Sequence, residues 1–184
     1  MRTMDLAAAT LALGRVRLEP FAEEHRAGLA AAAEADPALF RHMPFPVTSQ
    51  GYSAWFDLLR ADQAGGRSIP HAIFLDDAVV GQSCYLNIRQ RDAGVEIGST
   101  WYVRAVHGGI VNPSAKLLLL NHAFNSGAER VELKTDALND QSRAAILKLG
   151  AKFEGIHRRH MRRADGTLRD TAWYSVLREE WPHV

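Results

Sequence analysis

The sequence predicts a mixed α/β domain whose sheet, mostly antiparallel and of about seven strands, carries helices on both faces. Three observations lead to this fold class. Several short runs alternate apolar and polar residues, as half-buried strands do. Hairpin turn signals join some of these runs, and two other runs each lead into a helix-like segment. Because strands and helices do not alternate strictly, a doubly wound parallel sheet is excluded.

The first third of the chain predicts one strand and two helices. Residues 15–21 alternate apolar and charged side chains, a strand pattern that stops near a proline. Residues 22–35 are rich in alanine, glutamate and leucine, which predicts a helix that ends before the next proline. A second helix is expected to begin at Thr48 or Ser49, either of which is a good N-cap, and to end at Ala64 before a glycine pair.

The middle of the chain predicts three consecutive strands, over residues 70–75, 79–88 and 95–103. Asp76-Asp77 between the first two is a hairpin turn signal. These strands are followed by a helix that includes residues 117–124. The three strands and their turns therefore form the antiparallel part of the sheet.

The last third predicts a strand, a helix and a hairpin. Residues 130–138 form the strand, and residues 140–149 form a short helix that closes at Gly150, a residue that suits a helix C-terminus. The strands over residues 152–162 and 168–177 flank Asp165-Gly166, the strongest short-range hairpin signal in the chain.

The composition is that of a soluble globular protein and fits one domain over residues 1–184. Hydrophobic residues make up 47% of the chain and charged residues 23%, and the formal net charge of +1 gives no overall attraction to nucleic acid. No apolar run is long enough to cross a bilayer, and the N-terminus lacks a signal-peptide pattern. Cys84 is the single cysteine, so an internal disulfide is excluded; it is expected to be a packing residue rather than a nucleophile. These features predict a cytoplasmic protein without a membrane partner.

The most informative motif joins strand 95–103 to the next helix and reads His107-Gly108-Gly109-Ile110-Val111-Asn112-Pro113-Ser114-Ala115-Lys116. Glycines allow a positive φ and a close approach of a ligand to the backbone. Asn112 is the expected N-cap, with Pro113 at the first helical position and Lys116 in the first turn. Free N–H groups at a helix start suit a phosphate or pyrophosphate. The alternative is that the glycine pair only makes a tight strand-to-helix turn.

A second motif covers residues 136–151, where a strand leads through Asn139 and Ser142 into a helix that ends in Leu149-Gly150-Ala151. The two motifs resemble the GCN5-related N-acetyltransferase (GNAT) superfamily, most closely its RimJ/RimL-like ribosomal-protein N-acetyltransferase branch. The resemblance runs from Gly14-Arg15-Val16-Arg17-Leu18 to the segment 170–175. It implies the GNAT acyl-CoA N-acyltransferase fold, with acetyl-CoA as co-substrate and no metal.

The resemblance also implies the residues that bind acetyl-CoA. The turn at His107, Gly108, Gly109, Ile110, Val111 and Asn112, together with Lys116, corresponds to the pyrophosphate site, and the strand edge at Trp101, Tyr102 and Val103 to the partner of the pantetheine amides. Asn139 corresponds to a contact with the pantetheine arm. The family turn usually reads Arg/Gln-x-x-Gly-x-Gly/Ala, whereas this chain has His107, Ile110 and Asn112 at the matching positions. The turn is therefore expected to be a variant.

Glu96 is the candidate general base. It lies between apolar residues on a central predicted strand, where an acid is unusual unless it is paired or functional. An α-amine, with a pKa of about 7.7–8.0, needs only a mild base, which can act through water. The alternative is that Glu96 bonds a nearby arginine in a structural role. Backbone N–H groups where this strand opens would stabilise the tetrahedral intermediate.

Ser142 is the candidate proton donor to the leaving thiolate. Many family members use a tyrosine in the helix after the asparagine, but the matching position here is Ile146. The resemblance to the ribosomal-protein branch instead implies the serine three residues after Asn139. The alternative for Asn139 and Ser142 is ordinary capping of the helix.

The resulting function is an acetyl-CoA-dependent N-acetyltransferase that acts on a protein N-terminus or a small-molecule amine. Two alternatives stay open: a non-catalytic CoA-binding regulator, and an RNA-associated protein that uses the basic run at residues 157–163. Nucleic acid is the less favoured partner, and the sequence leaves open whether the protein is a homodimer. No zinc-ligand spacing occurs. Phe45 is expected to line the substrate cleft, and Tyr174 to belong to the core.

Overall fold

The computed structural model describes residues 3–44 and 51–181, and within these residues eight strands form a single sheet. The strand order is β1-β2-β3-β4-β5-β6-β8-β7, and all neighbours are antiparallel except β5 and β6. The strands are β1 (Leu11–Leu13), β2 (Val16–Pro20), β3 (Ile69–Leu75), β4 (Ala78–Arg89), β5 (Gly94–Tyr102), β6 (Arg130–Asp136), β7 (Lys152–Arg162) and β8 (Leu168–Leu177).

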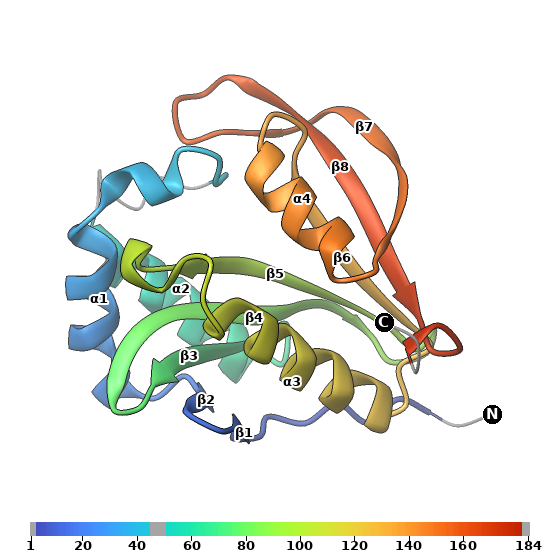
Figure 1. Cartoon of the computed structure of the whole chain (residues 1–184), viewed down its shortest axis with the longest axis horizontal. Helices are drawn as coiled ribbons and strands as arrows, with labels where there is room; N and C mark the ends of the chain where they lie inside the picture. The colour runs from blue at the N-terminus through green and yellow to red at the C-terminus, as the bar shows by residue number, and fades with distance from the viewer. Residues whose placement is uncertain (1–2, 45–50, 182–184) are drawn as a thin grey trace.

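Helices cover both faces of the sheet. The α-helices are α1 (Arg26–Glu34), α2 (Gly51–Ala64), α3 (Val111–Asn125) and α4 (Asp140–Lys148), and short 3-10 turns are η1 (Glu23–His25), η2 (Pro37–Phe40) and η3 (Arg104–Val106). In Figure 1, α3 and α4 lie in front of the sheet and α2 lies behind it. One apolar core lies under α3 and α4, with Val95 and Leu133 from the sheet, and a second lies under α1 and α2, with Phe56 and Trp101.

The predicted fold class is confirmed, and β7 and β8 begin and end at the predicted residues. The turn between them has Gly166 at a φ of +83°, as an Asp-Gly hairpin requires. Tyr174 is fully buried in the core, as expected. Cys84 is also fully buried, and burial raises the pKa of its thiol, which fits a packing role.

The main difference in the first half of the chain is the short strand β1, which pairs with β2 through a turn at Gly14. Residues 6–13 were not expected to form a strand, because a three-residue strand is too short to show an alternating pattern. The predicted helix over 22–35 begins as the 3-10 turn η1 before it becomes α1. Phe45, Thr48 and Ser49 lie outside the described residues.

The start of α3 also differs from the prediction. The helix begins at Val111, with Ile110 as an N-cap residue that makes no side-chain capping bond. Asn112 and Pro113 are therefore the second and third helical residues, and the assignment of Asn112 as N-cap and Pro113 as first residue is wrong. Pro113 still lies in the first turn, where its missing N–H costs nothing.

The sheet consists of two arms that separate between β5 and β6. These strands pair in parallel only at Gly94–Arg130, Val95–Val131 and Glu96–Glu132. Beyond Glu96 and Glu132 the two strands diverge, as Figure 1 shows. Among the helices of residues 3–44 and 51–181, none is long and apolar enough to cross a membrane.

Candidate functional site

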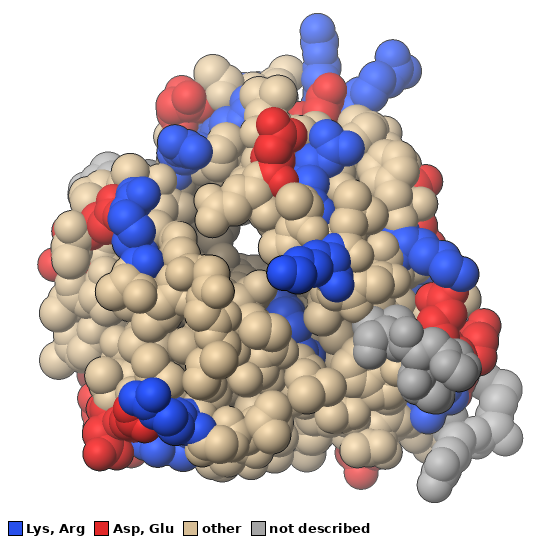
Figure 2. All heavy atoms as spheres, in the orientation of Figure 1, with Lys and Arg blue, Asp and Glu red and all other residues tan. Residues whose placement is uncertain are grey.

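The point where β5 and β6 separate is the centre of the candidate site. β5 continues to Tyr102 and β6 to Asp136 without pairing with each other, so one edge of β5 faces the gap. In the space-filling view, an opening passes through the molecule between β5 and α4 (Figure 2). A molecule bound in this opening could therefore be reached from both faces of the sheet.

A β-bulge shapes β5 beside the gap. Gln82 pairs with Trp101 and Cys84 with Gly98, so Ser99 and Thr100 together oppose Ser83 alone. Ser99 has a φ of +49°, which is uncommon for a residue other than glycine. The Gln82 side chain donates to the Ser99 carbonyl at 3.1 Å. Such a bulge redirects the strand and its backbone groups.

Lys116 fixes the bulge from α3. Its Nζ donates to Thr100 Oγ1 at 2.9 Å, and the Thr100 hydroxyl also lies 2.7 Å from Ser83 Oγ. Lys116 is only 8% exposed, and burial lowers the pKa of its ammonium group to about 8. Because α3 begins at Val111, Lys116 lies in its second turn and reaches the sheet rather than the turn. The expectation that Lys116 lies in the first turn of the helix is wrong, and its role in binding an anion stays a prediction.

The turn before α3 presents free backbone donors. The N–H groups of Gly108, Ile110, Val111 and Asn112 have no acceptor within the described part of the chain. Gly108 has a φ of +73°, and no atom lies within 4 Å of the position that a Cβ would take there. Four donors at the positive end of a helix, beside open space, form an anion-binding surface. The assignment of a pyrophosphate to this turn stays a prediction.

His107 holds this turn in place. Its Nε2 lies 2.9 Å from the Tyr102 carbonyl oxygen, so the imidazole closes the loop between β5 and α3. The Val103 N–H donates to the Val80 carbonyl at 2.8 Å. The Trp101 and Tyr102 side chains are buried in the cores on opposite faces. The Tyr102 carbonyl and the Val103 N–H are thus already bonded within the protein. Fewer backbone groups of Trp101, Tyr102 and Val103 are free to pair with a ligand than the resemblance implied.

Asn139 is the N-cap of α4. Its side-chain oxygen accepts a hydrogen bond from the Ser142 N–H at 3.1 Å, which confirms the capping interpretation. The Ser142 hydroxyl makes no hydrogen bond to any described residue and is partly exposed. Ile146 is buried in the core, and no tyrosine stands in its place. The proton-donor role of Ser142 stays a prediction.

Glu96 lies on the opposite face of the sheet from α3. Its neighbours Val95 and Ile97 pack in the core under α3, and strand alternation directs Glu96 the other way. The carboxylate is 1% exposed, and its Oε2 accepts from Lys134 Nζ at 2.9 Å and from Asn87 Nδ2 at 2.6 Å. The partner of Glu96 is therefore a lysine on β6, not the arginine considered from the sequence.

The other carboxylate oxygen of Glu96 is directed to the bulge. A Cβ built on Gly98 would lie 2.8 Å from Glu96 Oε1, so the glycine leaves room for this oxygen. Among the described residues, Oε1 has no hydrogen-bond donor. Glu96 thus has one oxygen held in place and one free beside the strand opening. The assignment of Glu96 as the general base stays a prediction.

Aromatic and basic side chains continue this face across β6, β7 and β8. Lys134 Nζ lies 4.9 Å from the centre of the Trp173 ring, and the His157 and His160 rings pack against the same tryptophan at 5.1 and 5.7 Å. Burial, then the charge of Lys134, lowers the pKa of His160. Lys134 and Trp173 were not singled out from the sequence, although alternate polar residues along β6 were a weak signal.

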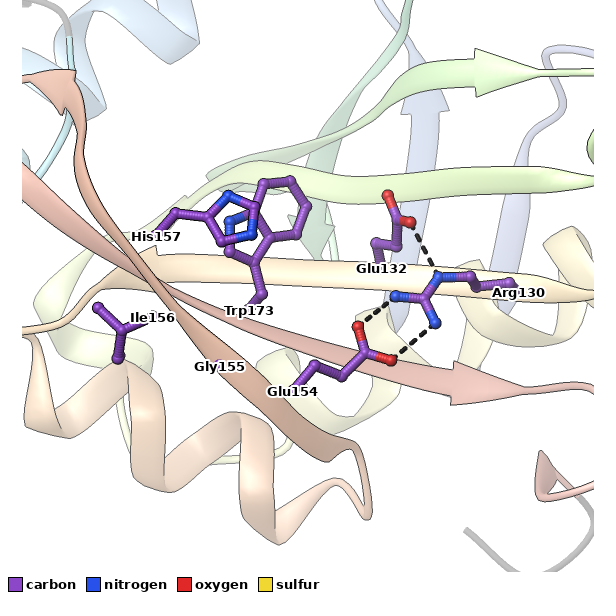
Figure 3. Close-up of a pocket in the computed structure, with 7 residues that line it drawn as sticks. All are labelled: Arg130, Glu132, Glu154, Gly155, Ile156, His157 and Trp173. Carbon is purple, nitrogen blue, oxygen red and sulfur yellow. Dashed lines mark hydrogen bonds and ion pairs between the residues drawn. The ribbon is translucent and has the colours of Figure 1, made fainter.

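A pocket of about 460 Å³ lies beside Trp173 on this arm of the sheet (Figure 3). Arg130 spans it, donating to Glu132 and to both oxygens of Glu154. His157 stacks over Trp173 at the other end. Arg89 also donates to both oxygens of Glu132, so the two arginines, Arg89 and Arg130, match the charges of Glu132 and Glu154, and this pocket offers no unpaired charge to a ligand.

The basic run at residues 157–163 does not act as a single surface. Arg158, Arg159 and Arg162 are exposed on β7, an edge strand of the sheet. Arg163 instead turns to the end of β6 and donates to both oxygens of Asp136 at 2.6 and 3.0 Å. Within residues 3–44 and 51–181, no three side chains come together as a metal site.

Comparison with known proteins relates this geometry to a family. A family model described as an acetyltransferase (GNAT) domain matches residues 15–152. The chain is similar to a GCN5-related N-acetyltransferase from Brucella melitensis, with a TM-score of 0.89, 28% identity, and 99% of this chain and 85% of that one covered. No curated protein sequence matches the chain.

Structures of RimJ and RimL are also among the similar structures. Mycobacterium smegmatis RimJ, in complex with CoA-disulfide, is 25% identical with a TM-score of 0.81, and covers 99% of this chain and 92% of its own. RimL, an α-N-acetyltransferase of ribosomal protein L7/L12, is 16% identical with a TM-score of 0.83, and covers 92% of this chain and 94% of its own. At that identity the RimL likeness concerns the fold alone.

Proposed function

This chain belongs to the acetyltransferase (GNAT) domain family, and on that premise we propose that it transfers an acetyl group from acetyl-CoA to a primary amine by direct attack in a ternary complex. One observation carries the proposal. The gap between β5 and β6 has free backbone donors at the start of α3 and an oriented carboxylate, Glu96, on the other face of the sheet.

The residues at the start of α3 fit the phosphate end of acetyl-CoA. The N–H groups of Gly108, Ile110, Val111 and Asn112 would donate to the pyrophosphate, and the absence of side chains at Gly108 and Gly109 gives access to them. When bound, acetyl-CoA supplies a thioester carbonyl that is already activated. The chain then has to hold the amine beside that carbonyl and remove its proton.

Glu96 is suited to remove the proton. Lys134 and Asn87 hold one carboxylate oxygen, which leaves Oε1 to accept a proton from the amine, directly or through one water. We propose that the Ser142 hydroxyl supplies the proton to the leaving thiolate. This hydroxyl makes no hydrogen bond to any described residue.

The chain also has features that suit a reducing compartment. Cys84 is the single cysteine of the sequence and is fully buried, so it has no partner for a disulfide. We therefore expect the protein to act in the cytoplasm, where acetyl-CoA and amine acceptors are both present.

The test is release of free thiol from acetyl-CoA in the presence of a panel of amines: N-terminal peptides, free amino acids, alkylamines and polyamines. The proposal expects turnover with at least one class and saturable binding of CoA by calorimetry. Tight CoA binding without turnover of any amine would contradict an enzyme and favour the non-catalytic regulator.

A further inference from the structure

Arg169 is a buried cation on the Glu96 face that has no carboxylate bonded to it among the described residues. It lies on β8 and is 4% exposed. Its Nε donates to Thr171 Oγ1 at 3.1 Å, and its Nη1 donates to the His42 carbonyl oxygen at 3.0 Å. Nη2 has no acceptor in the described part of the chain, although a guanidinium group has five N–H donors.

Asp136, the acid whose charge acts most strongly on Arg169, is already engaged by other groups. Asp136 accepts both bonds from Arg163 and one from the Leu138 N–H, and its Oδ2 lies 3.5 Å from His42 Nδ1. Burial alone would raise the pKa of Asp136, but these hydrogen bonds and the charges of Arg163 and Arg169 hold it below its ordinary value. Asp136 is thus an anion whose charge Arg163 matches, and the charge of Arg169 stays in excess.

The unmatched positive charge of Arg169 has a cost in free energy. Removing a guanidinium group from water is unfavourable unless an anion and hydrogen bonds replace the water. Burial lowers the pKa of Arg169, whereas the negative charges of Asp136 and Glu96 act in the opposite direction. A buried cation with free donors is typical of a site that a ligand's anion completes.

Arg169 and Glu96 face the same space. Arg169, Thr171 and Trp173 alternate along β8 on the side away from Tyr174, which packs in the core with α4. The Glu96 charge acts on both Arg169 and His160, and the Arg169 charge acts on His160. The His160 ring also packs against Trp173. Printed contacts aside from these charges also connect the two groups: Lys134 bonds Glu96 and lies over Trp173, His160 packs on Trp173 and lies 3.2 Å from Thr171 Oγ1, and Thr171 accepts from Arg169. Glu96 and Arg169 therefore belong to one connected cluster of side chains.

We propose that Arg169 binds an anionic group, a carboxylate or a phosphate, of the acceptor whose amine reacts beside Glu96. The inference rests on the proposed acetyl transfer and specifies its acceptor class. The fork of Arg169 suits the planar oxygen pair of a carboxylate and two oxygens of a phosphate equally. Acceptors that carry only positive charge, such as polyamines, lack the group that Arg169 recognises.

Matched pairs of acceptors test this in the unmodified protein. One series compares amino acids with the carboxamides of the same amino acids, and a second compares aminoalkylphosphonates with alkylamines of the same length. We expect kcat/KM to be at least about tenfold higher for the anionic member of a pair. The two series distinguish carboxylate from phosphate recognition. Equal kcat/KM within the pairs of both series overturns the proposal.

Variants assign the preference to Arg169. Arg169→Gln should raise KM for the anionic acceptor about tenfold or more and leave KM for its neutral counterpart and the Kd for CoA unchanged. Arg169→Lys should retain part of the preference, because it keeps the charge but not the fork. Arg158→Gln, at an exposed arginine of β7, is the matched control and should change none of these quantities. An equal loss with charged and neutral acceptors in Arg169→Gln would mean a structural role.

Failure of the proposed function would look different. If no amine is acetylated, the proposed function of acetyl transfer is wrong. The anion site is then tested by binding measurements instead of turnover. With CoA present, N-acetyl amino acids should then bind more tightly than their amides by calorimetry, and Arg169→Gln should abolish the difference. No difference in binding would overturn the anion site itself.

Discussion

The two sides of the candidate site consist of different chemical groups, backbone N–H groups on one side and side chains on the other. On the α3 side, the backbone N–H groups of Gly108, Ile110, Val111 and Asn112 have no acceptor among the described residues. On the other side, Glu96 is buried, and its orientation depends on the side chains of Lys134 and Asn87. A backbone site tolerates changes of residue type, whereas a side-chain site does not. Substitutions on the two sides should therefore have separable effects on binding and on turnover.

The largest expected effect is on turnover. Glu96→Gln keeps the shape and a hydrogen bond to Asn87 but cannot accept a proton, so kcat should fall by about 10²–10³. Acetyl-CoA should bind unchanged by calorimetry. Glu154→Gln is the control, because Glu154 is a carboxylate on β7 that is bonded to Arg130 instead of Lys134. Unchanged turnover in Glu96→Gln at neutral pH would exclude Glu96 as the base.

A variant of Lys116 tests whether this side chain of α3 is buried against the sheet or exposed at the turn. Burial lowers its pKa from 10.5 to about 8 in the folded protein. Between these values the unfolded chain binds more protons than the native protein, so stability rises with pH. The gain should reach about 2.5 kcal/mol at pH 10 relative to pH 7. Urea unfolding of Lys116→Met should lack this increment, and an identical pH dependence in both proteins would contradict the buried, perturbed lysine.

Changes in the turn should affect binding rather than chemistry. A Cβ at Gly109 would lie 3.3 Å from the Val106 carbonyl oxygen, and a leucine there would intrude on the N–H donors. Gly109→Leu should raise the Kd for acetyl-CoA about tenfold, with kcat at saturation retained. Asn125→Leu places the same residue type at the exposed far end of α3 and should change neither quantity. An unaltered Kd in Gly109→Leu would contradict the pyrophosphate site.

The smallest expected effect concerns the orientation of Glu96. Lys134→Met removes one of the two hydrogen bonds that orient the Glu96 carboxylate, so kcat should fall about threefold to tenfold while the Kd for acetyl-CoA stays unchanged. Lys134→Arg keeps a donor at this position and should restore most of kcat. Unchanged kcat in Lys134→Met would contradict the orienting role of Lys134.

The same contrast explains what the sequence could predict. The turn before α3 is local, so its glycines and its position between a strand and a helix were readable, and the family resemblance is confirmed. The exact start of α3 could not be read from the sequence. The helix begins without a side-chain cap, after a turn that the hydrogen bond between His107 and the Tyr102 carbonyl closes. The hairpin of β7 and β8 was predictable because its turn and alternation are also local.

The acid–base face could be predicted only in part. Glu96 was conspicuous as an acid among apolar residues, but its partner Lys134 lies 38 residues away on another strand. Arg169 lies on β8, and its burial depends on the packing of His42 from the segment after η2. Such contacts follow from the pairing of distant strands, which no local pattern encodes. The sequence therefore indicated the base without the groups that orient it.

A crystal structure of the protein with CoA tests the central claim most directly. We predict pyrophosphate oxygens within hydrogen-bond distance of the N–H groups of Gly108, Ile110, Val111 and Asn112. The thiol should lie in the gap between β5 and β6, with Glu96 Oε1 facing it from the opposite side of the sheet. CoA bound away from the α3 turn, or a thiol separated from Glu96 by packed protein, would contradict the account.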